Sequence, residues 1–259
     1  MENKVRRLFL VLSGFFITNA LLAEFIGVKL FSLESTLGYQ PVNWNILGIE
    51  NLSFNLTAGV LLWPFVFVLT DIVNEYFGKR GVKLLSYLTA GLIAYAFLMV
   101  LLAMSVTPAG FWVNREIGEG ANAVTIDMHQ SFNAVFGQGA WIIVGSLAAF
   151  LIGQLVDVYV FHYLRKITGS RKIWLRATGS TLVSQLIDSF VVLYIAFHIG
   201  GPGWPMKQIL AIMIINYIYK VAMALLMTPV IYLVHYSIDA YLGKRLSEKL
   251  TSAAALNKA

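Results

Sequence analysis

The sequence contains no cysteine, only four histidines and few charged residues, which make up 12% of its 259 residues. Without cysteine, disulfides and thiolate–metal sites are excluded. In a soluble globular domain about a quarter of the residues are charged, whereas here 58% are hydrophobic. The scarcity of charge therefore excludes an ordinary soluble protein and predicts an integral membrane protein.

Six apolar runs are long enough for a helix to cross a membrane, which takes about 20 residues. They lie at about 8–30, 57–77, 84–106, 140–164, 177–199 and 208–236. None shows the alternating polarity of barrel strands. The first follows basic residues but is too long for the core of a signal peptide, so we interpret it as a span. We expect an all-α integral membrane protein with six transmembrane helices, in which residues 1–259 form a single transmembrane domain.

Lysines and arginines are concentrated in every second segment that connects the apolar runs. Fifteen of the 19 fall in the N-terminus, after the second and fourth runs, and in the tail. They are Lys4, Arg6, Arg7, Lys79, Arg80, Lys83, Arg165, Lys166, Arg171, Lys172, Arg176, Lys244, Arg245, Lys249 and Lys258. The segments at 31–56, 107–139 and after the fifth run hold only Arg115 and Lys207. By the positive-inside rule both termini are expected in the cytoplasm, so the net charge of +6 reflects topology and does not indicate nucleic acid.

Motifs of enzymes and metalloproteins are missing from the sequence. No His-Glu-x-x-His, phosphate loop or Gly-x-Ser-x-Gly elbow occurs. Asp127 and His129 could be read as metal ligands, but such a pair without further ligands is more typical of a loop or helix start. We therefore expect no catalytic residues, no metal and no cofactor.

Polar residues inside the apolar runs are the candidate site. They are Asp71, Asn74 and Glu75 in the second run, Gln154 and Asp157 in the fourth, Gln185 and Asp188 in the fifth, and Asn216 and Lys220 in the sixth. Such residues are costly in hydrocarbon, so they normally face a bundle interior or a water-filled cavity. Within each run they are three or four residues apart, which places them on one helix face. We predict that these nine residues bind a substrate.

Two aspartates are expected at the same depth. Asp71 precedes Lys79 by eight residues, and Asp157 precedes Arg165 by eight. Both runs lead toward the cytoplasm in the predicted topology, so each carboxylate lies roughly 12 Å from the inner basic edge. We expect Asp71 and Asp157 to form opposite walls of one cavity.

Some candidates also have a structural interpretation. Glu75 lies near the inner edge and could be an interface residue, and Gln185 could hydrogen-bond a neighbouring helix without touching a ligand. Lys220 is at least eleven residues from either end of its run and cannot easily reach water. We expect it to pair with Asp188 or Asp157.

The ordered motifs resemble the queuosine precursor transporters, also called the vitamin uptake transporter family. The resemblance covers about residues 10–240 and rests on Pro64-Phe65, Thr70-Asp71, Glu75, Phe77-Gly78, Phe132-Asn133, Val135-Phe136-Gly137, Gln154, Asp157 and Lys220. It implies a multi-pass transporter of the bacterial inner membrane that imports deazaguanine bases, in their 7-cyano and 7-aminomethyl forms, for tRNA modification. The implied partners are this small molecule and the lipid bilayer, and a homo-oligomer stays open.

The polar residues suit such a base independently of the resemblance. A guanine-type ring presents an N–H and an amino group side by side, which one carboxylate can accept with two hydrogen bonds. Asp71, Asp157 and Asp188 are candidates for this role, and the amides suit the ring carbonyl. Excess carboxylates in the runs would favour a cationic substrate or proton-coupled uptake.

Two other classes of protein stay open. A substrate-binding subunit of an energy-coupling-factor importer is also a small six-helix membrane protein. Its docking stripe of small residues in the first span is not matched by Ala20-Leu21-Leu22-Ala23. An intramembrane enzyme is the other alternative, but no nucleophile–base pair is present in the sequence.

Overall fold

The computed structural model describes residues 2–118, 123–137, 140–168, 173–200 and 203–255. Its helices are α1 (Glu2–Ile26), α2 (Leu33–Thr36), η1 (Ala58–Leu61), α3 (Trp63–Ser105), α4 (Gly110–Val113), α5 (Met128–Phe136), α6 (Ala140–Thr168), α7 (Ile173–Leu193), η3 (Tyr194–Ile199), α8 (Met206–Leu242) and α9 (Lys244–Ala255). Its strands are β1 (Leu30–Ser32), β2 (Trp44–Ile46), β3 (Ile49–Leu52), β4 (Asn55–Thr57), β5 (Asn114–Ile117) and β6 (Val124–Asp127). Helices dominate, as the sequence predicts.

Within the described ranges, five helical stretches are long and apolar enough to cross a membrane. They are α1, α3, the stretch Met128–Thr168 with α5 and α6, the stretch Trp174–Ile199 with α7 and η3, and α8. The six predicted runs correspond to only five stretches because the runs at 57–77 and 84–106 both fall in α3, with η1 just before it. The architecture is that of an all-α membrane protein.

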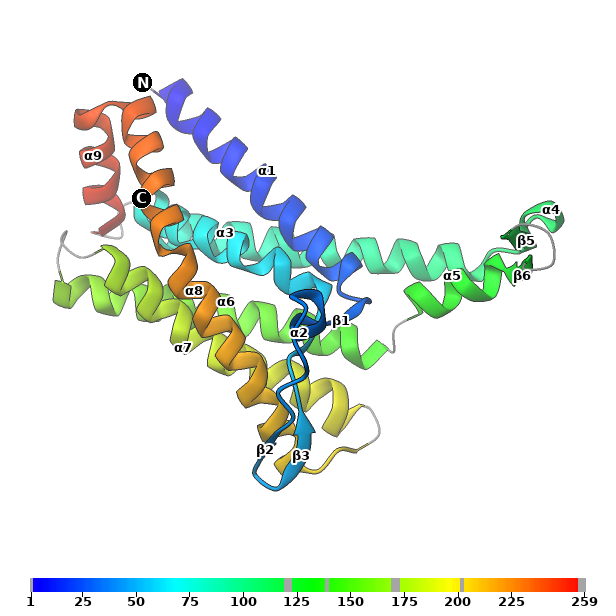
Figure 1. Ribbon diagram of the computed structural model, residues 1–259. Coiled ribbons are helices and arrows are strands. Elements are labelled where there is room, and N and C mark those ends of the chain that lie inside the picture. Colours follow the sequence, from blue (N-terminus) through cyan, green and yellow to red (C-terminus); the bar gives the residue numbers. More distant parts are fainter. Residues whose placement is uncertain (1, 119–122, 138–139, 169–172, 201–202, 256–259) are drawn as a thin grey trace.

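The long helix α3 reverses direction at Gly78. This residue has φ 67° and ψ −169°, a backbone conformation that is not helical. Phe77 packs on Phe9 near the start of α1, with ring centroids 4.9 Å apart, whereas Phe97 stacks on Phe25 near its end at 5.9 Å. The preceding η1 also lies against the end of α1. The parts of α3 before and after Gly78 therefore run antiparallel, as Figure 1 shows.

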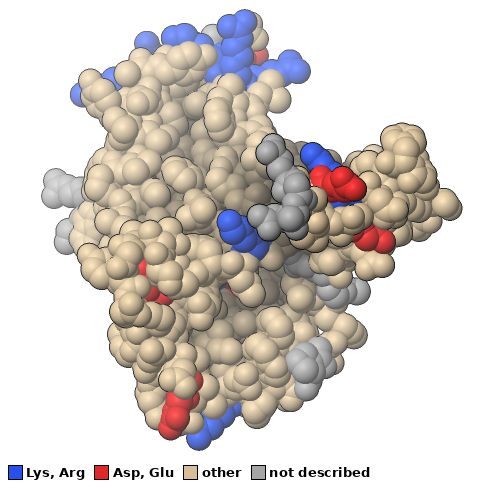
Figure 2. All heavy atoms as spheres, turned by 45° about the vertical axis from the view of Figure 1, so that its right-hand side comes forward, with Lys and Arg blue, Asp and Glu red and all other residues tan. Residues whose placement is uncertain are grey.

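The start of α1, the helix α9 and the C-terminal end of α6 lie at one end of the molecule (Figure 1), and Gly78 lies there too, because it contacts Ala254 of α9. We call this the terminal end. Lys and Arg gather over it in the space-filling view (Figure 2). Lys4 donates a hydrogen bond to the carbonyl of Tyr241 at 3.0 Å, which ties the two terminal regions together. Arg171, Lys172 and Lys258, which the sequence analysis assigns to the cytoplasmic side, lie outside the described residues.

The two long connecting segments at the opposite end form small antiparallel pairs. Strands β1 and β4 pair, as do β2 and β3, and the second pair reaches α8. The Phe54 amide donates to Glu34 Oε1 at 2.8 Å, which ties α2 to the segment between β3 and β4. Strands β5 and β6 pair at the tip of an arm that projects away from the bundle (Figure 1).

The apolar core lies where α1, the first part of α3, α6 and α8 meet. Phe16, Ile72, Phe150 and Phe161 are buried there, and each projects from a face of regular helical spacing. Next to this core the first part of α3 turns its other face toward α7 and α8. The candidate site lies between these three helices.

Candidate functional site

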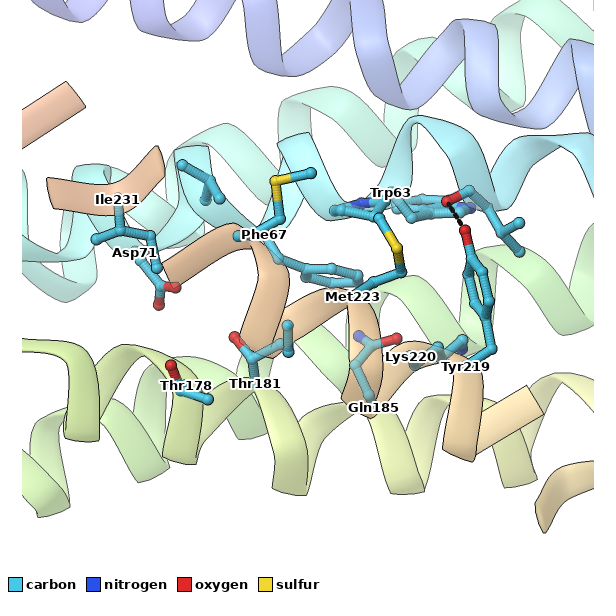
Figure 3. A pocket seen from close by; sticks show the side chains of 15 residues that line it. Trp63, Phe67, Asp71, Thr178, Thr181, Gln185, Tyr219, Lys220, Met223 and Ile231 are labelled. Carbon is cyan, nitrogen blue, oxygen red and sulfur yellow. Dashed lines mark hydrogen bonds between the residues drawn. The ribbon is translucent and has the colours of Figure 1, made fainter. Parts of the chain in front are cut away.

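A pocket of about 490 Å³, its open mouth included, lies between the first part of α3, α7 and α8 (Figure 3). Its lining residues are Val60, Trp63, Pro64, Phe67, Val68, Asp71, Thr178, Thr181, Gln185, Tyr219, Lys220, Met223, Ala224, Met227 and Ile231. On each helix they recur at intervals of three or four residues, so one face of each helix points inward. Of the nine predicted site residues, Asp71, Gln185 and Lys220 line this pocket.

One wall of the pocket is aromatic. Trp63 and Phe67, one turn apart on α3, stack with ring centroids 6.0 Å apart and an interplanar angle of 25°. Met223 of α8 faces them across the pocket (Figure 3). Aromatic faces and a polarizable thioether suit a flat, apolar ring surface.

The polar groups in the pocket are left with unused hydrogen-bonding capacity. Asp71 is 3% exposed, and its Oδ1 has no partner among the described residues. Gln185 is 2% exposed, and neither its amide nitrogen nor its amide oxygen has a described partner. An unsatisfied buried polar group costs about 1–3 kcal/mol, so a ligand that bonds to these groups recovers this free energy. Asp71 and Gln185 lie toward different ends of the pocket (Figure 3).

Lys220 pairs with Asp188, which is one of its two expected partners. Lys220 Nζ donates to Asp188 Oδ2 at 2.5 Å, and the two side chains are only 18% and 20% exposed. The pair joins α8 to α7 beside the pocket. Asn216, one turn before Lys220, is half-buried and does not line the pocket.

Glu75 lies outside the pocket, in an ion-pair network nearer the terminal end. Its Oε1 accepts from Arg176 at 2.8 Å and from Arg165 at 3.3 Å. Arg165 also donates to the carbonyl of Thr251 at 2.7 Å. All three charged residues are buried. The network joins α3 to α6, α7 and α9 and closes the bundle at this end.

The remaining predicted residues lie between α3, α6 and α7, behind the pocket wall. Gln154 Oε1 accepts from the Thr70 hydroxyl at 3.2 Å. Asp157 is 1% exposed and accepts from the Ser184 hydroxyl at 3.3 Å. Asn74 is fully buried. None of Gln154, Asp157 and Asn74 lines the pocket, but Asp157 is close enough to Asp71 for their charges to interact.

Comparisons with known proteins agree with this picture of a membrane protein. Residues 57–234 match the model of a family described as "Putative vitamin uptake transporter". The chain belongs to this family. A Bacillus subtilis (strain 168) protein named "Probable queuosine precursor transporter" is 31% identical over 200 residues, which cover 76% of this chain and 80% of the relative. A second relative, from Escherichia coli (strain K12), is named "Queuosine precursor transporter" and is 29% identical over 204 residues, 78% of this chain and 81% of its own.

Membership of the vitamin uptake transporter family confirms the resemblance found in the sequence. It also makes the chain a multi-pass protein of the bacterial inner membrane, in agreement with its apolar helices. The relatives are named as transporters and not as enzymes. No solved structure matches the chain.

Several residues that line the pocket are not predicted by sequence analysis. Thr178 and Thr181 precede Gln185 by seven and four residues and so share its helix face. This spacing would allow both threonines to be predicted from the sequence as pocket residues. Met223 and Tyr219 carry no such signal, because apolar and aromatic residues look alike whether they face lipid, the core or a pocket.

Proposed function

We propose that the chain imports queuosine precursors across the bacterial inner membrane and binds them in the pocket between α3, α7 and α8. The observation that carries the proposal is the combination of unpartnered, buried Asp71 and Gln185 with the aromatic wall of Trp63 and Phe67. The names of the relatives support the choice of substrate.

The substrates we propose are 7-deazaguanine bases in the 7-cyano and 7-aminomethyl forms. The Asp71 carboxylate accepts hydrogen bonds from the ring N–H and the exocyclic amino group, while the Gln185 amide, toward the other end of the pocket, bonds to the substituent at position 7. Trp63 stacks on the ring.

We further propose six membrane crossings, with the two parts of α3 crossing separately and both termini in the cytoplasm. The terminal end then faces the cytoplasm, in line with its lysines and arginines. The network of Glu75, Arg165 and Arg176 closes that end. Release of the base to the cytoplasm requires these ion pairs to separate, so we assign Glu75 to release and not to binding.

Liposomes that contain only this chain test the proposed function. We expect them to accumulate 7-aminomethyl-7-deazaguanine, whereas empty liposomes and liposomes with the Asp71→Asn variant do not. Uptake that appears only after an ATPase and a scaffold subunit are added would instead make the chain a substrate-binding subunit of an energy-coupling-factor importer. Conversion of the base would indicate an enzyme.

The buried carboxylates also suggest the hypothesis that uptake is coupled to the movement of protons. The same liposomes test it when uptake is compared with and without an imposed proton gradient, over a range of pH. A rate that changes with neither the gradient nor pH would remove the proton as coupling ion.

A further inference from the structure

The carboxylate of Asp157 is a buried charge that the pocket does not use. It is 1% exposed, and its Oδ2 has no partner among the described residues. Its Oδ1 accepts from Ser184 at 3.3 Å, and the side chains of Ser180 and Thr181 also lie within its reach. No ion pair with a described lysine or arginine compensates its charge. A charge at this depth in a membrane is costly unless a partner neutralises it.

A second unpartnered side chain, Asn74, belongs to the same part of the interface between α3 and α6. The Thr70 hydroxyl donates to Gln154 at 3.2 Å, which fixes the register of α3 against α6. The two helices run in the same direction here, since the ion pair nearer the terminal end joins later residues of both. Asn74 follows Thr70 by four residues, and Asp157 follows Gln154 by three, so both occupy the next turn of this interface. Asn74 is fully buried, and neither of its amide atoms has a described partner.

The oxygens gathered in this interface are those that hard metal cations prefer: carboxylate, hydroxyl and amide oxygens. The described residues hold no group of three or more His, Cys, Asp and Glu that could bind a metal, which argues against a transition-metal centre. Asp71 faces the pocket and Glu75 is paired with two arginines, so among these three carboxylates Asp157 is left to bind an ion, and its single charge matches a monovalent ion. A proton would use one of these oxygens, whereas a metal ion uses several at once.

We propose that Asp157, Asn74 and Ser184, together with Ser180 and Thr181, bind a sodium ion behind the pocket. The ion neutralises Asp157 and is coordinated by oxygens of Asp157 and Asn74 that otherwise have no described partner. The site stands on these contacts alone, whereas its role in uptake rests on the proposed function.

The position of Asp71 couples the ion to the base. Asp71 and Asp157 carry like charges that interact across the pocket wall. A sodium ion beside Asp157 removes this repulsion and leaves Asp71 free to accept from the base. Because coupling between two binding equilibria is reciprocal, the base also tightens binding of sodium. An inward sodium gradient then drives uptake.

Thermal melting without any base tests the site by itself. The purified protein is melted in NaCl and in choline chloride at the same pH and ionic strength. We expect Tm to rise with the logarithm of the NaCl concentration above Kd, reaching about 5 °C above its value in choline chloride at roughly twenty times Kd. Asp157→Asn removes this shift, and Ser184→Ala, which keeps the charge, requires about tenfold more NaCl for the same rise in Tm. Glu116→Gln, at an exposed position on β5, leaves the shift unchanged.

A Tm that is equal in NaCl and choline chloride would overturn the site. So would a Tm that follows pH and ignores NaCl, because Asp157 would then hold a proton. If the sodium site is present, binding of 7-aminomethyl-7-deazaguanine measured in both salts tests the coupling. We expect about tenfold tighter binding in NaCl, and equal affinities would overturn the coupling. If no base binds while NaCl still raises Tm, the proposed function fails and the sodium site stands.

Discussion

At the scale of single residues, the ion pair between Lys220 and Asp188 makes a specific prediction. Lys220→Met leaves Asp188 charged and unpaired in the bundle. Breaking a fully buried pair costs about 3–5 kcal/mol, and partial exposure reduces the cost here. We expect a clearly lower Tm, and partial recovery when Asp188→Asn is added. Lys207→Met, at an exposed position of the same helix, is the matched control and leaves Tm unchanged. If the double variant melts no higher than Lys220→Met alone, the pair does not contribute as described.

Sequence spacing predicts part of the site at this scale. It indicates that Asp71, Gln185 and Lys220 face the bundle interior, because an ionisable or amide side chain is costly in lipid. It does not say which interior face borders a pocket. The rotation of α6 is set by its packing against α3 and α7, so Asp157 lies behind the pocket wall and not in it.

At the scale of secondary-structure elements, the turn at Gly78 determines how α3 folds back. Its φ of 67° and ψ of −169° belong to a region that is essentially restricted to glycine. An added Cβ would also lie 3.3 Å from the carbonyl oxygen of Ala254 in α9. We expect Gly78→Ala to lower the free energy of unfolding by about 1–3 kcal/mol. Gly91→Ala is the control in the same helix, where a Cβ meets no atom within 4 Å.

Thermal melting of both glycine variants checks this turn. We expect Gly78→Ala to melt below wild type and Gly91→Ala to melt at or above it, because alanine favours a regular helix. Equal Tm values for the two variants would contradict the strained turn. The sequence predicts a connection between the second and third apolar runs. It does not predict that the turn is a single residue, because the pattern of apolar residues in the sequence does not show which glycine adopts a positive φ.

At the scale of the whole molecule, the absence of cysteine allows a clean test of topology. Single cysteines introduced as Arg80→Cys, Glu116→Cys and Ser252→Cys occupy exposed positions after Gly78, on β5 and on α9. With six crossings, a membrane-impermeant thiol reagent labels position 116 in right-side-out vesicles and positions 80 and 252 in inside-out vesicles. Labelling of positions 80 and 116 from the same side would contradict separate crossings by the two parts of α3.

The central claim is that the pocket with Asp71 binds the imported base, and direct binding tests it most directly. Asp71→Asn keeps the side-chain volume but turns an acceptor-only group into one that presents donors to the donors of the base. Loss of hydrogen bonds to a charged group costs about 1.5–3 kcal/mol. Calorimetric titration of purified protein with 7-aminomethyl-7-deazaguanine should therefore give a Kd at least tenfold weaker for Asp71→Asn, with Tm near that of wild type. Glu116→Gln should bind as wild type does. Wild-type affinity in a folded Asp71→Asn variant would contradict the account.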